Sequence, residues 1–192
     1  MRTTRRGLTR DAVVAAAADL ADEIGLDQIH LATLAGRLGV RTPSLYNHIA
    51  GLDGLRRDLT LLGLRELRRR LATAAIGRSG NAALAAMADA YRVFVRDRPG
   101  LATATVPSPR LVAVDDPEVM AVEAETMRIL LAALAGYGLT GDDAIHAARV
   151  FRAAIHGFAT LEASGGFGVP VEIDESFRRL VAMVTSAFGP SR

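Results

Sequence analysis

The residues best suited to recognise a partner form a short run without an acidic side chain, RTPSLYNH at 41–48. Five of the seven positions from Thr42 to His48 carry hydrogen-bonding side chains. Hydroxyl, amide and imidazole groups with no carboxylate among them suit the phosphates and base edges of nucleic acid. The run therefore indicates DNA binding.

Two short helices are expected to position this run. The first spans 31–38, and Gly39 after it is suited to a helix C-terminus because glycine readily adopts positive φ. The second is predicted over 42–49, with Thr42 as its N-cap and Pro43 at its first helical position. The apolar stripe of the first helix is Leu31, Leu34, Ala35 and Leu38.

The second helix has an inward and an outward face. Leu45 and Ile49 lie four residues apart and are expected to face inward. The outward residues are Ser44, Tyr46, Asn47 and His48. Two helices joined by a tight glycine turn, with polar and aromatic residues on the second, are typical of a DNA-binding helix-turn-helix. Helical hairpins of other all-helical folds share this periodicity and stay open as an alternative.

Composition favours an all-α protein. Half of the 192 residues are hydrophobic, which suits one large domain or a small domain plus a larger one. All 23 basic residues are arginine, which we attribute to genomic base composition. The chain has no cysteine, hence no disulfide or thiolate metal site, and no secretion signal or membrane-length apolar run. We expect a cytoplasmic protein without a membrane partner.

Positive charge is concentrated in the first part of the chain. Residues 1–70 hold twelve arginines against eight acids, whereas residues 71–192 hold eleven against thirteen. The basic part is the part with the helix-turn-helix, as expected if it meets phosphates. Arg2, Arg5 and Arg6 form either a disordered tail or an arm that contacts DNA.

The remaining periodicity predicts a head, a connector and a body, with about nine helices in all. A helix over 10–24, capped by Thr9, can share a core with the two short helices. A long helix over 52–71 carries two apolar stripes, so we expect it to connect a head (1–52) to a larger helical body (53–192). Later helices are predicted around 84–98, 116–134, 140–164 and 174–188, the last of them capped by Asp174.

Residues 9–55 resemble the N-terminal domain of the tetracycline-repressor-like (TetR) family of bacterial transcription regulators. LAGRLGV at 34–40 and SLYNHI at 44–49 carry the resemblance. The run FRAAIHGFATLEASGGFG, from Phe151, resembles a tryptophan-histidine-glycine-type subgroup of C-terminal bodies. Ile49 stands where an aromatic residue is frequent, and Leu52 stands where many members have a phosphate-contacting lysine. Arg56 or Arg57, one turn on, could replace that lysine.

The resemblance implies a repressor that binds a palindromic operator in double-stranded DNA as a homodimer. The second helix of the motif would enter the major groove. The last two long helices, about 142–164 and 175–188, would form the dimer interface. The implied DNA contacts are Arg41, Thr42, Pro43, Ser44, Tyr46, Asn47 and His48.

The resemblance further implies a small-molecule effector that binds in the helical body and releases the operator. The residues that would line the effector site are largely apolar, so we expect a hydrophobic effector. The same side chains would also suit an ordinary helical core. The candidates are Met87, Tyr91, Phe94, Met120, Met127, Phe151 and His156.

Two other classes of function are weighed against the regulator: a small enzyme, and a helical interaction module that does not bind DNA. The four histidines form no metal-binding spacing, and the chain has no HExxH, phosphate-binding loop or nucleophile elbow. We therefore predict no catalytic residue, no metal and no cofactor.

Overall fold

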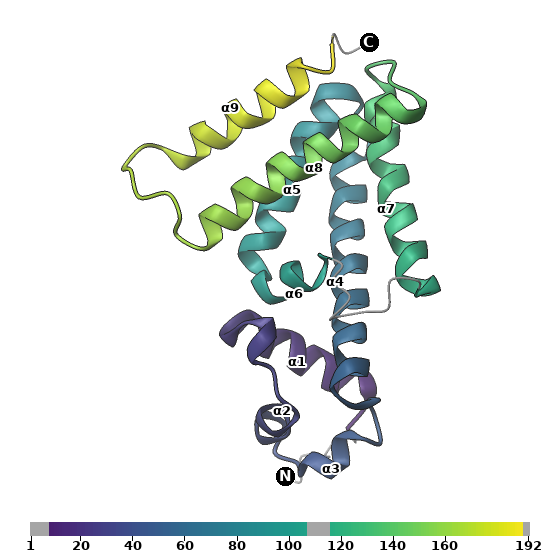
Figure 1. Cartoon of the computed structure of the whole chain (residues 1–192), viewed down its shortest axis with the longest axis vertical. Helices are drawn as coiled ribbons and strands as arrows, with labels where there is room; N and C mark the ends of the chain where they lie inside the picture. Colours follow the sequence, from purple (N-terminus) through teal and green to yellow (C-terminus); the bar gives the residue numbers. More distant parts are fainter. Residues whose placement is uncertain (1–7, 107–115, 190–192) are drawn as a thin grey trace. The chain divides into compact units, whose positions relative to one another are not determined.

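The computed structural model describes residues 8–106 and 116–189. Within these ranges the chain forms nine α-helices, one short 3-10 helix and no strand, so the all-α prediction is confirmed (Figure 1). No helix in this part of the chain is long and apolar enough to cross a membrane. The arginines at 2, 5 and 6 lie outside the described residues. The chain divides into two compact units, the first comprising Met1–Gly63 and Arg98–Asp116 and the second comprising Leu64–Asp97 and Pro117–Arg192.

The first unit contains the helix-turn-helix and one helix from later in the chain. The predicted cap of the first helix is confirmed, since the Thr9 hydroxyl oxygen accepts a hydrogen bond from the Ala12 amide at 3.2 Å. Gly39 adopts the left-handed conformation (φ 66°) that ends the second helix. The helices are α1 (Arg10–Ile24), η1 (Leu26–Gln28), α2 (Leu31–Leu38), α3 (Thr42–Leu45), the beginning of α4 (Gly51–Ala75) and α6 (Pro99–Ala104).

Helix α3 is shorter than predicted. Arg41 is its N-cap, so the prediction that Thr42 caps the helix is wrong by one residue. The α-helix ends at Leu45 and turns continue over 46–48, where asparagine and histidine are weak helix formers. The inward face forms as predicted: Leu45 is fully buried and Ile49 is 5% exposed.

Helix α6 was not predicted, because Pro99-Gly100 has the sequence of a helix end. A side chain of α1 caps it: Asp22 accepts the Gly100 amide at 2.8 Å and the Nε of Arg98 at 2.5 Å. The backbones of α1 and α6 also approach closely at this point. A Cβ on Gly100 would lie 2.3 Å from the carbonyl carbon of Ala21. Only glycine fits this contact.

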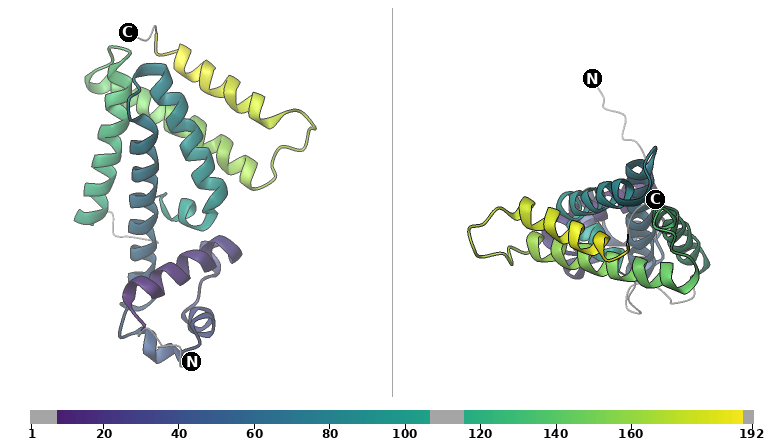
Figure 2. Two further views of the ribbon diagram at one scale, coloured as in Figure 1. Left: turned by 180° about the vertical axis from the view of Figure 1, so that it is seen from behind. Right: turned by 90° about the horizontal axis from the view of Figure 1, so that it is seen from above.

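The second unit is a layered set of long helices. Helix α8 lies beside α9 and packs on α5 and α7, and α9 also contacts α5 (Figures 1 and 2). Besides the last part of α4, its helices are α5 (Gly80–Asp97), α7 (Pro117–Ala135), α8 (Gly141–Ala163) and α9 (Ile173–Ser186). Its fully buried large side chains include Leu84, Met87, Phe94, Leu134, Phe151 and Phe177.

Two apolar stripes are predicted for α4: Leu55, Leu59 and Leu62 form the first, and Leu61, Leu64, Leu67 and Leu71 form the second. Leu55 and Leu59 are fully buried in the first unit. Leu64, Leu67 and Leu71 are less than 10% exposed and belong to the second unit. Leu61, 4% exposed, lies in the first unit, and Leu62 is only half-buried, so the buried face changes a few residues before the boundary between Gly63 and Leu64.

Arg92 of α5 ties α8 to the start of α9. Its Nε donates to Glu162 at 2.6 Å, and its terminal nitrogen lies 2.8 Å from Asp174. The guanidinium also lies 4.8 Å from the centre of the Phe177 ring. We expected Asp174 to cap α9, but Glu172 is the N-cap residue. Asp174 lies in the first turn instead, where it pairs with Arg92.

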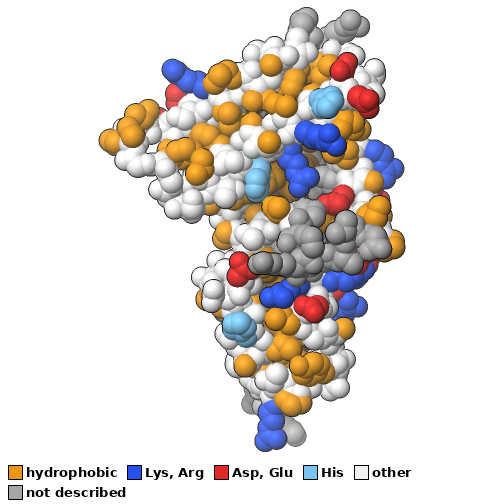
Figure 3. All heavy atoms as spheres, viewed as in Figure 1, with side chains coloured by type: hydrophobic (Ala, Val, Ile, Leu, Met, Phe, Trp, Pro, Cys, Tyr) orange, Lys and Arg blue, Asp and Glu red, His pale blue; other side chains and the backbone are white. Residues whose placement is uncertain are grey.

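The surface of α8 and α9 keeps several apolar side chains exposed. Val150 and Leu161 of α8 are 54% and 51% exposed, and Met183 of α9 is 67% exposed. Gly157, also on α8, has open space where a Cβ would be. Figure 3 shows hydrophobic side chains spread over this part of the surface.

Candidate DNA-binding face and effector cavity

The predicted DNA contacts form one face of the first unit, which we call the recognition face. Tyr46 is 60% exposed, and Arg41, Pro43 and Asn47 are also exposed. The remaining three positions are half-buried. Leu45 and Ile49 anchor the segment from behind. The recognition face consists of Arg41, Thr42, Pro43, Ser44, Tyr46, Asn47 and His48.

The polar side chains of the recognition face are available to an external partner. Within the described residues, none of them makes a hydrogen bond or ion pair to another side chain. The nearby acids of the unit are instead engaged by other arginines. Glu23 accepts two hydrogen bonds from Arg37, at 2.6 and 2.7 Å, and Asp58 accepts two from Arg10, at 2.5 and 3.0 Å. The bond from Arg37 lowers the pKa of the Glu23 carboxyl.

The two arginines that could replace the family's lysine differ in their surroundings. Arg57 is already paired with an acid, because its Nε donates a hydrogen bond to Asp116 at 2.5 Å. Arg56 makes a longer contact, 3.5 Å, with Asp53, a residue whose side chain is 93% exposed. Of the two, Arg56 is therefore the better placed to reach a phosphate.

The second unit contains a cavity between α4, α5, α7 and α8, with almost wholly apolar walls. The space open to the centre of a water-sized sphere is about 80 Å³. The lining residues are Leu64, Leu67, Leu71, Met87, Tyr91, Glu123, Thr126, Met127, Leu130, Phe151, Arg152 and Ile155.

Four of the seven predicted ligand contacts line this cavity: Met87, Tyr91, Met127 and Phe151. The other three lie elsewhere. Phe94 is fully buried in the core, where the Arg70 guanidinium lies 5.4 Å from the centre of its ring. Met120 is 52% exposed. His156 does not line the cavity but contacts Tyr91, which does: the Tyr91 hydroxyl oxygen lies 2.7 Å from the His156 Nδ1.

Sequence reasoning missed the leucines of α4 and two charged residues of the lining. The leucines belonged to a recognised apolar stripe, but nothing in the stripe indicates which neighbour it faces. Nothing in the sequence distinguished Glu123 and Arg152 from the other charged residues of α7 and α8. Their common location depends on how α7 packs against α8.

Two of the four polar side chains that line the cavity, Thr126 and Tyr91, are already paired. The Thr126 hydroxyl donates to the Val122 carbonyl at 2.8 Å. Burial, and secondarily the charge of Arg152, lower the pKa of His156. The imidazole is therefore neutral at pH 7, and its Nδ1 can accept the hydrogen bond of the Tyr91 hydroxyl.

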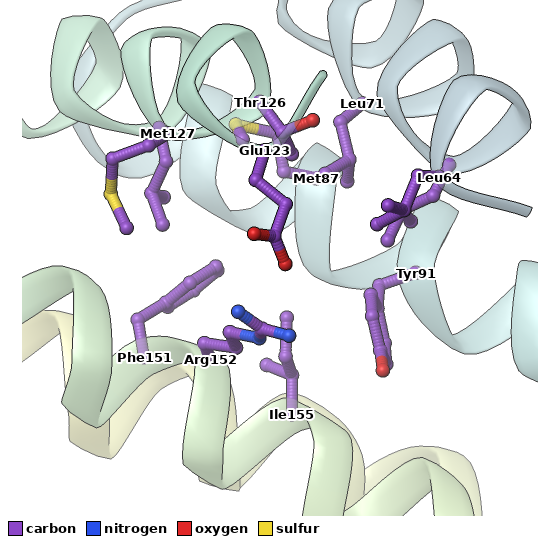
Figure 4. A pocket seen from close by; sticks show the side chains of 12 residues that line it. Leu64, Leu71, Met87, Tyr91, Glu123, Thr126, Met127, Phe151, Arg152 and Ile155 are labelled. Carbon is purple, nitrogen blue, oxygen red and sulfur yellow. The ribbon is translucent and has the colours of Figure 1, made fainter. Parts of the chain in front are cut away.

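Glu123 and Arg152 differ from those groups. Figure 4 shows the carboxylate of Glu123, from α7, and the guanidinium of Arg152, from α8, pointing toward one another from opposite walls. Neither makes a hydrogen bond or ion pair with any described residue. The cavity thus has an apolar interior and two opposite charges at one place in its wall.

Comparison with known proteins identifies the family. A model of the tetracyclin repressor-like C-terminal domain matches residues 84–184. The chain is 36% identical to the uncharacterized HTH-type transcriptional regulator YobS of Bacillus subtilis over 173 residues, which cover 90% of this chain and 88% of YobS. The chain belongs to the TetR family of transcriptional regulators. It is also 35% identical to the uncharacterized HTH-type regulator Rv0681 of Mycobacterium tuberculosis, over 82% of this chain and 72% of that protein.

Solved structures of this family share the fold. PfmR, a TetR family regulator from Thermus thermophilus, superposes with a TM-score of 0.70 at 18% identity, over 91% of this chain and 97% of PfmR. A TetR variant from Acinetobacter baumannii in complex with minocycline gives 0.68 at 24% identity, over 94% and 96%. The TetR assignment shows a transcriptional regulator rather than an enzyme. The tryptophan-histidine-glycine-type subgroup stays a prediction.

Proposed function

We propose that this TetR-family member is a ligand-responsive repressor that binds a palindromic operator as a homodimer. A small, mainly apolar effector would bind in the cavity and release the DNA. The division into a DNA-binding head (1–52) and an effector and dimerisation body (53–192) belongs to this proposal. The observation that carries it is the recognition face: exposed, free of acids and anchored from behind by buried Leu45 and Ile49.

The chemistry of the recognition face supports a major-groove role. Ser44 and Asn47 offer groups that pair with base edges, and Tyr46 offers a hydroxyl for a phosphate. Arg41, at the N-cap of α3, supplies the face with its positive charge. A carboxylate on this face would be repelled by phosphates, and the sequence places none there.

A mobility-shift titration on DNA flanking the protein's own gene tests this role. Tyr46→Ala should weaken binding to all sequences together, by roughly tenfold if one hydrogen bond of about 1.4 kcal/mol is lost. Arg41→Gln should lower the slope of log affinity against log salt by about one, because one fewer counterion is released. Gln28→Ala, an exposed change in η1 away from this face, is the control. If Tyr46→Ala and Arg41→Gln both bind DNA as tightly as the unsubstituted protein, the recognition face is not the DNA-binding surface.

The exposed apolar side chains of α8 and α9 support the homodimer. Val150, Leu161 and Met183 would be costly to leave in water, and burying them against a second copy removes that cost. The open space above Gly157 lets another helix approach closely. Two copies related by a two-fold axis would present two recognition faces to one palindrome.

Sedimentation at micromolar concentration tests the dimer. Leu161→Glu combined with Met183→Glu should give a monomer that no longer binds the operator. Ile76→Glu is the matched control, since Ile76 is 73% exposed but lies outside α8 and α9. A doubly substituted protein that remains dimeric would contradict the assigned interface.

Release of DNA would follow a population shift. An effector that binds better to a conformation unsuited to the operator favours that conformation by its difference in affinity. The cavity suits this role because it is lined by four helices of the second unit, including the part of α4 in that unit. In the solved structure of the Acinetobacter TetR variant a small molecule, minocycline, is bound.

A further inference from the structure

The wall of the cavity carries two charges of opposite sign that the proposed repressor mechanism leaves unexplained. Glu123 of α7, which is half-buried, and Arg152 of α8, which is exposed on its outer side, both line the apolar space. Their charged ends point toward one another across it (Figure 4). Within the described residues, no hydrogen bond or ion pair engages either of them.

Two opposite charges facing one space select against a charged ligand group. A carboxylate would be attracted by Arg152 and repelled by Glu123, and an ammonium or amidinium the reverse, so the two effects largely cancel. A neutral group with both a donor and an acceptor can bond to both residues at once. Bonds to ionised partners are stronger than bonds between neutral groups.

We propose that the effector of this cavity carries a neutral donor-and-acceptor head group, such as a primary amide, held between Glu123 and Arg152 with its apolar body among the leucines of α4. This inference rests on the proposed function, since it specifies the ligand of that same cavity. The other hydrogen-bonding groups of the lining support it. The hydroxyl protons of Thr126 and Tyr91 are already engaged, so among the side chains of the lining Arg152 is left as the donor and Glu123 as the charged acceptor for the head group.

The size of the cavity limits the body of the ligand. One water needs roughly 10–15 Å³ of the space that a water-sized sphere can occupy. A space of about 80 Å³ therefore accepts about one ring with a short substituent. Phe151, 1% exposed, and Met127 supply flat and adaptable surfaces against such a ring.

An isosteric series of three probes tests the head group. These are 4-propylbenzamide, 4-propylbenzoate and 4-propylbenzamidine, which are neutral, negative and positive at pH 7.5. Their dissociation constants are measured by titration calorimetry on the full chain without DNA. We expect the amide to bind about tenfold more tightly than either ion, a difference of about 1.4 kcal/mol.

Two variants identify which charge rejects which probe. Glu123→Gln should strengthen benzoate binding and weaken amide binding, and Arg152→Gln should strengthen benzamidine binding and weaken amide binding. Arg149→Gln, on the same helix and exposed like Arg152 but outside the lining, should leave all three affinities within about twofold. Circular dichroism confirms that each variant is folded.

The remaining outcomes overturn the head-group assignment. Preference for benzoate or benzamidine would show that one charge dominates, equal binding would show that the head is not recognised, and no binding at millimolar concentration would show that the cavity rejects this class. Operator release is measured separately. Amide binding without release would leave the assignment standing and would count against the effector role in the proposed function.

Discussion

The recognition face and the cavity hold their functional side chains in opposite ways. On the recognition face the side chains are exposed or half-buried, and the anchoring is done by different residues, Leu45 and Ile49. In the cavity the side chains that would contact a ligand also stabilise the fold, since Phe151 and Met87 line the space and, at 1% exposure, belong to the core. Function and stability are therefore separable in the first region and coupled in the second.

This difference has a physical basis. A surface that binds phosphates must keep its donors solvated until DNA replaces the water. A site for an apolar ligand must instead be built from side chains that water already excludes. Substitutions can distinguish the two regions by comparing the loss of stability with the loss of binding.

The largest expected effect comes from the cavity. Phe151→Ala should lower the free energy of unfolding by about 3–5 kcal/mol, through lost burial and the space left behind. Asn47→Ala on the recognition face should change it by less than about 0.5 kcal/mol. Urea titration of both variants measures the contrast. If Phe151→Ala and Asn47→Ala lose similar free energies of unfolding, the two regions do not differ in how they couple function to stability.

An intermediate effect is expected from the scaffold of the recognition face. Gly100→Ala places a Cβ against the backbone of Ala21 and should cost about 1–3 kcal/mol. Gly36→Ala in α2 is the matched control, because nothing lies within 4 Å of its added Cβ. There the better helix propensity of alanine should stabilise the protein by up to about 1 kcal/mol. If the unfolding temperature shifts equally in Gly100→Ala and Gly36→Ala, the backbones of α6 and α1 are not in close contact at Gly100.

The smallest effect concerns pH and the second unit. Burial and Arg152 lower the pKa of His156 from its ordinary value of 6.5, so the unfolded chain takes up this proton first. Stability should therefore fall as the pH drops below about 6.5, until the pH passes the folded-state pKa. His156→Gln should remove this part of the dependence. Identical pH profiles for the two proteins, from urea titrations between pH 7.5 and 5, would contradict it.

Local patterns in the sequence predicted most of the first unit. Thr9 and Gly39 act at helix ends through bonds to their own neighbours, so their roles are visible without a tertiary structure. The two stripes of α4 were visible for the same reason. The end of α3 at Leu45 was missed, because turns that keep a helix-like bond from Ile49 to Leu45 preserve the helical spacing of apolar residues.

Long-range partners explain the other errors. Pro99-Gly100 begins a helix because Asp22, far away in the sequence, caps it. Asp174 fails to cap α9 while pairing with Arg92 of another helix. Phe94 and Met120 shared the apolar character of the cavity residues, yet the packing of α7 and α8 left them outside the lining.

The sequence by itself determined the helical class, the helix-turn-helix and the acid-free recognition face, because periodicity and end-capping act over a few residues. Only the tertiary structure decided that α6 belongs with α1, and that Glu123 and Arg152 face one another across an apolar space. Such pairings depend on how helices distant in the sequence pack, and no local pattern of residues records that packing.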